Sequence, residues 1–284
     1  MPHNNQLLSE SSNTITLDQM ARKSKPQGAY LLRLLSLPIL FFLTFPLIAL
    51  VMRTTPGDVV RNLSHPQVAQ AVILSLSTTL VSTFITILLG TPLAYALSLR
   101  VFPFPRLLDT LIDLPLVLPP AVAGVALLMA FGRRGILGGV LEVLGIDIAF
   151  TTIAVVIAQV FVAAPFYIKS AALGFSNVEL ELTQAAGLDG ARSWQVFRYV
   201  IMPLSWTAML SGAVMTWARA LGEFGATIIF AGNFPGRTQT MPLAIYIGFE
   251  LDLDVALTLS VILIGLSFLA LLTVKGIFGR DWMS

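Results

Sequence analysis

The chain has 284 residues, of which 56% are hydrophobic and only 11% are charged, and its formal net charge is +2. Soluble domains carry about 25% charged residues, so this composition excludes a soluble protein and indicates an integral membrane protein. The basic residues are scattered rather than gathered in a stripe, which excludes a nucleic-acid partner. Cysteine is absent from the sequence, and the two histidines, His3 and His65, lie in polar connecting segments, so neither a disulfide nor a membrane-embedded metal site is expected.

Residues 1–27 are rich in Ser, Asn, Gln and Lys and poor in large apolar side chains. This composition predicts a disordered polar tail on the cytoplasmic side. The first apolar run begins near Tyr30, behind this long leader, so the start does not resemble a cleavable signal peptide. Residues 28–280 are expected to form a transmembrane domain.

Six apolar runs are long enough to cross the roughly 30 Å of bilayer hydrocarbon as helices. They are residues 30–52, 68–99, 107–131, 151–174, 203–230 and 253–275. The second and fifth runs are long enough to tilt or to extend past the hydrocarbon. With the N-terminus in the cytoplasm, most Lys and Arg residues fall on inner segments, so both termini are predicted to be cytoplasmic.

The third run contains Pro115, Pro119 and Pro120. Prolines remove backbone donors and bend a helix, which a membrane protein tolerates only against protein or water. Either a packing kink or a functional break is compatible with this pattern, and Pro119 and Pro120 are candidates for a translocation path. Asp109 and Asp113, at the start of the same run, are expected to be solvated near the inner surface.

The second run contains hydroxyl side chains at helical spacing. These side chains can donate to a passing anion, but they more often pack helices together or bond to their own backbone. The second interpretation is favoured here. The residues are Ser75, Ser77, Thr78, Thr79, Ser82, Thr83 and Thr86.

The longer cytoplasmic segment, residues 176–202, predicts two short helices joined by a glycine turn. Ser176 and Glu179 form a capping-box pattern that predicts the first helix start. Gly187 and Gly190 can close this helix, because glycine accepts the left-handed conformation of a helix end.

Ser193 is expected to cap the second helix, and Pro203 to open the fifth span. An amphipathic hairpin in the headgroup layer, with Trp194 and Phe197 inward and two arginines, Arg192 and Arg198, outward, is one interpretation of this segment.

The fifth run carries two charges, Arg219 and Glu223, with Gly222 between them. Charges within a span are costly, about 2.5–3.5 kcal/mol each on insertion scales, and the i, i+4 spacing lets these two pair. The pair can simply fix helix packing. Alternatively, Arg219 supplies positive potential to an anion path while Glu223 prevents tight retention.

Two other classes are less well supported. An ion-coupled secondary transporter, with Glu223 as its proton or cation site, would show paired repeats that the sequence lacks. A membrane-embedded enzyme would need a catalytic motif, and none of the common ones occurs, so no catalytic residue is predicted.

The cytoplasmic segment resembles the signature of bacterial ABC-importer permeases, in which a Glu-Ala-Ala triplet and a glycine precede a closing Ile-x-Leu-Pro. Gln184, Ala185, Ala186, Gly190 and Pro203 match these positions, with Gln184 in place of the glutamate. Met202 likewise replaces the leucine. The resemblance implies the all-α type I importer permease fold. It also implies a coupling loop that docks on an ATPase subunit through these residues and neighbouring side chains such as Trp194.

Residues 218–226 and 231–246 are similar to permeases for molybdate, tungstate and sulfate, and the later part resembles the molybdate branch more closely. The resemblance implies a subunit that translocates molybdate or tungstate by alternating access. A sulfate or thiosulfate permease is the alternative. Candidates for the translocation path or gate are Arg219, Gly222, Glu223, Pro119 and Pro120.

The sequence has no glycine-rich run ending in Gly-Lys-Ser/Thr, so a permease of this kind is expected to take its energy from a separate ATPase that binds ATP and Mg. No cofactor is expected in this chain. The resemblance implies a second permease copy, an extracytoplasmic oxyanion-binding protein and membrane lipid as partners, and a bacterial or archaeal cytoplasmic membrane as the location.

Overall fold

The computed structural model describes residues 29–278. The predicted polar tail, residues 1–27, lies outside this range, as do residues 28, 279 and 280 of the predicted membrane domain. Within the described residues the secondary structure is entirely helical, which confirms the predicted all-α class. The chain divides into two units, residues 1–52 and 53–284.

The first unit contains one long apolar helix, α2 (Ala29–Arg53), which matches the first predicted run. Its 25 residues extend about 37 Å at 1.5 Å per residue, enough to cross a bilayer. Large apolar side chains are exposed along its whole length, including Leu35 at 67% and Phe42 at 70%. A helix that is apolar all round is suited to a lipid environment.

The second unit is built around three helices that pack along one another: α4 (Pro66–Ser98), α8 (Thr152–Ser176) and α12 (Trp206–Leu221). Small residues set the distance between α8 and α12. A Cβ at Gly174 would lie 2.6 Å from Ala208 Cβ, and one at Gly212 would lie 2.8 Å from Ser170 Cβ. These glycines therefore allow the two backbones to approach closely, as is usual between helices in membranes.

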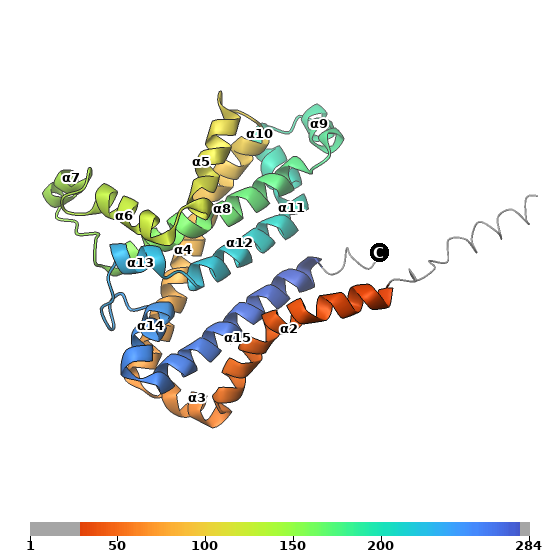
Figure 1. Ribbon diagram of the computed structural model, residues 1–284. Coiled ribbons are helices and arrows are strands. Elements are labelled where there is room, and N and C mark those ends of the chain that lie inside the picture. Colours follow the sequence, from red (N-terminus) through yellow and green to blue (C-terminus); the bar gives the residue numbers. More distant parts are fainter. Residues whose placement is uncertain (1–28, 279–284) are drawn as a thin grey trace, which may run out of the picture. The chain divides into compact units, whose positions relative to one another are not determined.

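The remaining long helix, α15 (Leu253–Phe278), contacts α12 and the short apolar helix α14 (Met241–Leu251). Figure 1 shows α9 (Leu180–Leu188) and α10 (Ser193–Val196) near the carboxyl ends of α4 and α8, whereas α3 (Pro56–Leu63), α13 (Gly225–Phe230) and α14 lie toward the other end of this unit. The helices that continue the chain after α10 are η1 (Phe197–Ile201, a π-helical turn) and α11 (Met202–Leu204).

The third predicted run is not one continuous helix. It divides into α5 (Pro105–Val117) and α6 (Pro120–Phe131), which meet at an angle of 114°. A residue that precedes proline avoids the helical region. Leu118 and Pro119 both precede a proline, and their ψ angles are 135° and 133°. The two adjacent prolines therefore produce a true break, whereas Pro115 is tolerated within α5.

The fifth predicted run, residues 203–230, is also interrupted and does not form one continuous helix. Its regular part is α12, and the chain leaves the helix at Gly222 and resumes as α13 at Gly225. Before α12, the helical segment Ser193–Leu204 meets it at an angle of 71°. Pro203 thus lies before this bend and does not open the span; Trp206 does.

Among residues 29–278, four helices are long and apolar enough to cross a membrane, and counting each bent pair as one span raises the number to six. The predicted number of about six spans is therefore compatible with the structure. The helices α7 (Gly138–Val143), α3 and α14 were not predicted. They are short, and their apolar residues do not form a run of span length.

The hydroxyl side chains of α4 largely bond to their own backbone, as the sequence favoured. Thr79 Oγ1 donates to the Ser75 carbonyl at 2.7 Å, and Thr86 Oγ1 donates to the Ser82 carbonyl at 2.8 Å. Ser75 has an additional role, because its Oγ accepts the Met241 N–H at 2.7 Å and so ties α14 to α4.

Candidate functional site

The predicted capping box of the loop was wrong. Helix α8 continues to Ser176, whose Oγ donates to the Ala172 carbonyl at 2.9 Å. Its hydroxyl is therefore engaged by its own helix, and it is not at a helix start. The next helix, α9, begins at Leu180, and Glu179 occupies the position before it.

The predicted glycine turn is present. Gly190 has a φ of +85°, in the left-handed region that L-residues other than Asn and Asp rarely adopt. Here the Ala191 N–H reaches back to the Ala186 carbonyl at 3.0 Å, and the Asp189 N–H bonds to the Ala185 carbonyl at 3.0 Å. No atom outside its chain neighbours lies within 4 Å of a Cβ built at Gly190. The need for glycine is therefore conformational and not steric.

The second loop helix begins at Ser193, one residue earlier than a cap at Ser193 would place it. The Arg192 N–H donates to Gln195 Oε1 at 2.7 Å, which satisfies a backbone donor at this helix start. Ser193 is thus the first helical residue and not the cap.

Phe197 anchors this second helix to the membrane helices. It is 6% exposed, and its ring centroid lies 4.5 Å from that of Tyr95 on α4 and 5.7 Å from that of Phe175 on α8. Ile201 is buried in the same cluster. Trp194, in contrast, is 64% exposed, so of the two aromatic residues expected to face inward only Phe197 is buried against the helices of this unit. The buried side chains of this segment, Phe197 and Ile201, pack against α4 and α8.

Helix α9 projects from the unit without a buried residue. Leu188 is 90% exposed and Leu180 is 65% exposed, while Gln184 and Ala185 are exposed and Ala186 is half-buried. Apolar side chains outside the spans that are left this open mark a surface for another protein. The loop therefore combines a fixed half, held by Phe197, with an open half in α9.

Arg219 and Glu223 form the predicted pair at 3.0 Å. Glu223 is almost completely buried, and the Arg219 side chain is 33% exposed. The second oxygen of Glu223 accepts the Ala226 N–H at 2.8 Å, at the start of α13. Both oxygens are thus engaged, one by the cation and one by the backbone, so Glu223 holds together the break between α12 and α13.

The two broken runs meet at their breaks. A Cβ built at Gly225 would lie 2.3 Å from Pro120 Cβ, and one at Gly124 would lie 2.7 Å from Ile229 Cβ. Helices α6 and α13 therefore pack at close range, with glycines at the contact. The structure in this way brings Pro119 and Pro120 next to the segment that holds Gly222 and Glu223, which their separation in sequence did not reveal.

Asp109 and Asp113 are not simply solvated, as the sequence suggested. Both carboxylates bind Lys169 of α8, and the Asp113 contact is 2.9 Å. The three side chains tie α5 to α8. The sequence signal that could have identified this cluster is the i, i+4 spacing of the two aspartates, which places them on one face of a helix.

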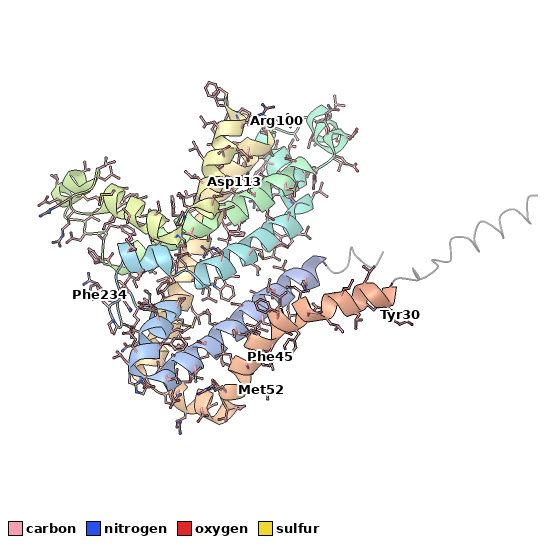
Figure 2. The ribbon with its side chains drawn as sticks, viewed as in Figure 1. Tyr30, Phe45, Met52, Arg100, Asp113 and Phe234 are labelled. Carbon is pink, nitrogen blue, oxygen red and sulfur yellow. The ribbon has the colours of Figure 1, made fainter. Side chains whose placement is uncertain are left out.

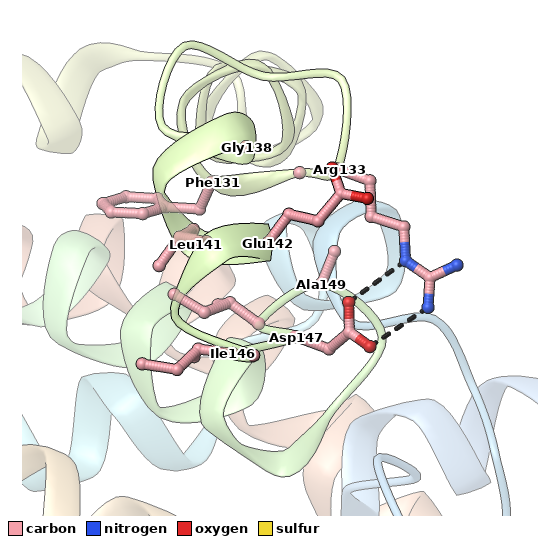
Figure 3. A pocket seen from close by; sticks show the side chains of 11 residues that line it. Phe131, Arg133, Gly138, Leu141, Glu142, Ile146, Asp147 and Ala149 are labelled. Atoms are coloured by element: carbon pink, nitrogen blue, oxygen red, sulfur yellow. Dashed lines mark hydrogen bonds and ion pairs between the residues drawn. The ribbon is translucent and has the colours of Figure 1, made fainter.

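A second group of charges, missed from the sequence, lies after α6. Arg133 donates from Nε and from one terminal nitrogen to the two oxygens of Asp147, each at 3.1 Å, beside a cavity of about 300 Å³ (Figure 3). The hydrogen bonds and charge of Arg133 hold the pKa of the Asp147 carboxyl below its usual value. This bidentate pair joins the residues before α7 to the residues after it.

A family described as "Binding-protein-dependent transport system inner membrane component" matches residues 86–275. The chain belongs to this family. It is therefore a component of a transport system of the bacterial inner membrane, with several membrane-spanning helices.

Curated relatives of this inner membrane component cover most of its length. The molybdenum transport system permease protein ModB of Mycobacterium tuberculosis is 41% identical over 233 residues, 82% of this chain and 88% of that protein. The probable transport system permease protein NifC of Clostridium pasteurianum is 36% identical over 244 residues, 85% of each chain. The probable sulfate transport system permease protein cysT of Chlorokybus atmophyticus is 34% identical over 216 residues, 75% of this chain and 76% of that protein.

The fold is that of ABC importer permeases. A bacterial ABC transporter that imports the acidic polysaccharide alginate contains a chain that matches 88% of this one, and 96% of its own length, with a TM-score of 0.67 at 17% identity. At this identity the likeness concerns the fold.

Proposed function

We propose that this chain is the membrane-spanning subunit of an ATP-driven importer that carries molybdate or tungstate. The observation that carries the cargo assignment is the relationship to the molybdenum permease of M. tuberculosis, at 41% identity over 82% of this chain. The resemblance of residues 231–246 to the molybdate branch supports the same assignment.

Coupling to a separate ATPase is supported by the loop geometry. Helix α9 presents Gln184, Ala185 and apolar side chains on an open surface, and Gly190 turns the chain back toward Phe197. A partner that moves α9 would act on α4 and α8 through the rings around Phe197. In this proposal ATP and Mg are bound by the partner ATPase and not by this chain, which performs no catalysis itself.

The assembly would contain two permease copies, two ATPase subunits and an extracytoplasmic oxyanion-binding protein. The family description, which names a binding-protein-dependent system, supports the last of these. We propose an identical second copy, because this chain resembles homodimeric systems.

The breaks at Pro119–Pro120 and at Gly222–Glu223 are proposed to form the gate of the anion path. Helix breaks in membranes occur where the backbone is covered by protein or lines a water-filled cavity. Glu223 neutralises Arg219, so the anion would meet a weakened positive potential and would not be retained.

Uptake measurements test the proposal. The chain would be co-expressed with its candidate ATPase and binding protein in cells that lack molybdate uptake, and radiolabelled molybdate accumulation would be measured with excess unlabelled sulfate or tungstate. Tungstate should suppress accumulation, and sulfate should have little effect. Suppression by sulfate alone would favour the alternative cargo.

The alternative of a sulfate permease has its own observation, the 34% identity to the probable sulfate permease of Chlorokybus. An ion-coupled secondary transporter is less well supported, because both oxygens of the buried Glu223 are already engaged, one by Arg219 and one by the Ala226 N–H. Molybdate uptake that persists without any ATPase subunit would favour the ion-coupled secondary transporter.

A further inference from the structure

Three positively charged side chains line one cavity on the α9 side of the second unit. The cavity measures about 610 Å³ and is bounded by the carboxyl ends of α4 and α8 and the start of α5. Arg100 comes from the end of α4, Arg106 from the first turn of α5 and Lys169 from α8. Figure 2 labels Arg100 at this end of the unit and Asp113 further along α5.

The charges of the cavity do not cancel. Lys169 is bound to Asp109 and Asp113, of which only Asp109 also lines the cavity. Neither Arg100 nor Arg106 forms an ion pair with any residue of the described range 29–278. Three cations against one lining carboxylate leave a lining charge of +2.

The backbone at Arg100 supports a role for its side chain. Its φ is +52°, in the left-handed region where an L-residue is disfavoured and glycine is the usual choice at a helix end. The Arg100 N–H bonds to the Leu97 carbonyl at 3.0 Å and the Val101 N–H to the Ala96 carbonyl at 3.2 Å, so this turn closes α4. A strained arginine that opens onto a cavity is the kind of outlier from which a function can be inferred.

We propose that this cavity binds a tetrahedral, phosphate-type oxyanion. Guanidinium groups bind phosphate through paired hydrogen bonds, and an ammonium group adds a point charge. Two sources share this chemistry: the headgroup of an anionic phospholipid and a free inorganic anion. The exposed Leu173 on the wall offers a surface for an acyl chain, and basic pockets between membrane helices are known to hold anionic headgroups.

Asp109 competes with the proposed ligand, because its carboxylate already forms an ion pair with Lys169. A bound oxyanion would share Lys169 with this carboxylate, and removal of the carboxylate charge should strengthen binding. The proposal concerns a site away from the Arg219–Glu223 region and does not depend on which anion the importer carries.

The first arm tests the lipid. The full-length chain, purified in detergent, would be titrated with phosphatidylglycerol or with phosphatidylcholine and the bound lipid counted by native mass spectrometry. Arg100→Gln and Arg106→Gln should each weaken phosphatidylglycerol binding about fivefold, from the contribution of one basic side chain near a membrane surface. Arg134→Gln, at an exposed arginine outside the cavity, is the matched control and should leave binding unchanged.

The second arm tests the free anion. Sodium phosphate, at constant ionic strength set with sodium chloride, should raise the thermal unfolding midpoint of the delipidated chain and should do so less in the two arginine variants. A response to phosphate without selective phosphatidylglycerol binding would assign the site to a free oxyanion. Selective lipid binding without a phosphate response would assign it to the headgroup.

Asp109→Asn keeps the proposal testable if the arginine variants fail to fold. This variant retains the Asp113–Lys169 contact and should bind the probe more tightly than the unchanged chain. The proposal is overturned if neither probe binds, or if Arg134→Gln weakens binding as much as Arg100→Gln. It is also overturned if Asp109→Asn binds less tightly. Gel filtration and circular dichroism would establish that each variant is folded, and Arg100→Lys should recover part of the binding.

Discussion

At the scale of single residues, the backbone conformation of Gly190 sets the direction of the chain at the proposed docking surface on α9. Its φ of +85° directs the chain from α9 into α10, and no neighbouring atom limits the size of its side chain. A substitution at Gly190 therefore tests the effect of the backbone conformation, because the new side chain would not clash with neighbouring atoms.

We predict that Gly190→Val will uncouple ATP hydrolysis from transport while membrane insertion is retained. A β-branched residue is strongly disfavoured in the left-handed region, by roughly 1–2 kcal/mol or more, so the turn should rearrange. The measurement is ATPase activity of the reconstituted complex with and without the binding protein. Gly190→Asn is the matched control, because asparagine has a similar volume but tolerates this conformation. Equal behaviour of the two variants would contradict the conformational explanation.

Substitutions of Arg219 and Glu223 can distinguish a structural role of this ion pair from a role in transport. We predict that Arg219→Gln destabilises the protein more than Glu223→Gln, because it leaves the buried carboxylate without its cation. Loss of one partner of a buried ion pair costs about 3–5 kcal/mol, and the partial exposure of Arg219 should place the effect toward the lower end. In Glu223→Gln the amide oxygen can still accept the Ala226 N–H.

Thermal unfolding and anion uptake would be measured for both single variants and for the double variant. If the pair only fixes packing, the double variant should recover stability and transport together. Recovery of stability without transport would assign Arg219 to the anion path.

At the scale of elements, the loop is held by an aromatic contact between α10–η1 and the ends of α4 and α8. We predict that Phe197→Ala lowers stability by about 3 kcal/mol, as for other buried Phe→Ala changes, and abolishes coupling. Tyr199→Ala is the matched control, since Tyr199 is 70% exposed. Unfolding midpoints and ATPase stimulation would be measured for each, and equal effects of the two would show that the Phe197 contact does not transmit movement.

The contact between α6 and α13 depends on the absence of side chains. Gly225→Ala is predicted to destabilise the protein by roughly 1–3 kcal/mol, because its Cβ would overlap Pro120 and overpacking has costs of this size. Gly222→Ala is the comparison, because its Cβ would meet nothing closer than 3.9 Å. Unfolding midpoints in detergent measure both. A stable Gly225→Ala variant would mean that the two helices can separate freely.

At the scale of the whole molecule, the chain offers a direct test of orientation because its sequence contains no cysteine. Single cysteines at Leu188 on α9 and at Val143 on α7, which are 90% and 88% exposed, would be labelled in intact cells with a membrane-impermeant maleimide. We predict that Val143→Cys reacts from outside and Leu188→Cys reacts only after permeabilisation. The opposite pattern would reverse the predicted orientation.

Much of the fold was predictable because a bilayer imposes a simple rule. A span needs about 20 apolar residues, and α2, α4, α8 and α15 satisfy it as uninterrupted helices. The glycine turn at Gly190 and the pairing of Arg219 with Glu223 were also predictable, because each depends on local spacing. The capping box at Ser176 failed because a serine hydroxyl can serve the helix it ends as well as the helix it begins.

The sequence by itself determined the membrane class, the all-α fold and the position of the loop, since these follow from composition and from contacts within a few residues. Only the tertiary structure decided that the two broken runs meet at Pro120 and Gly225, that Asp109 and Asp113 bind Lys169, and that Phe197 but not Trp194 is buried. These contacts join residues far apart in the chain. Their geometry depends on how the helices pack, and no local pattern encodes it.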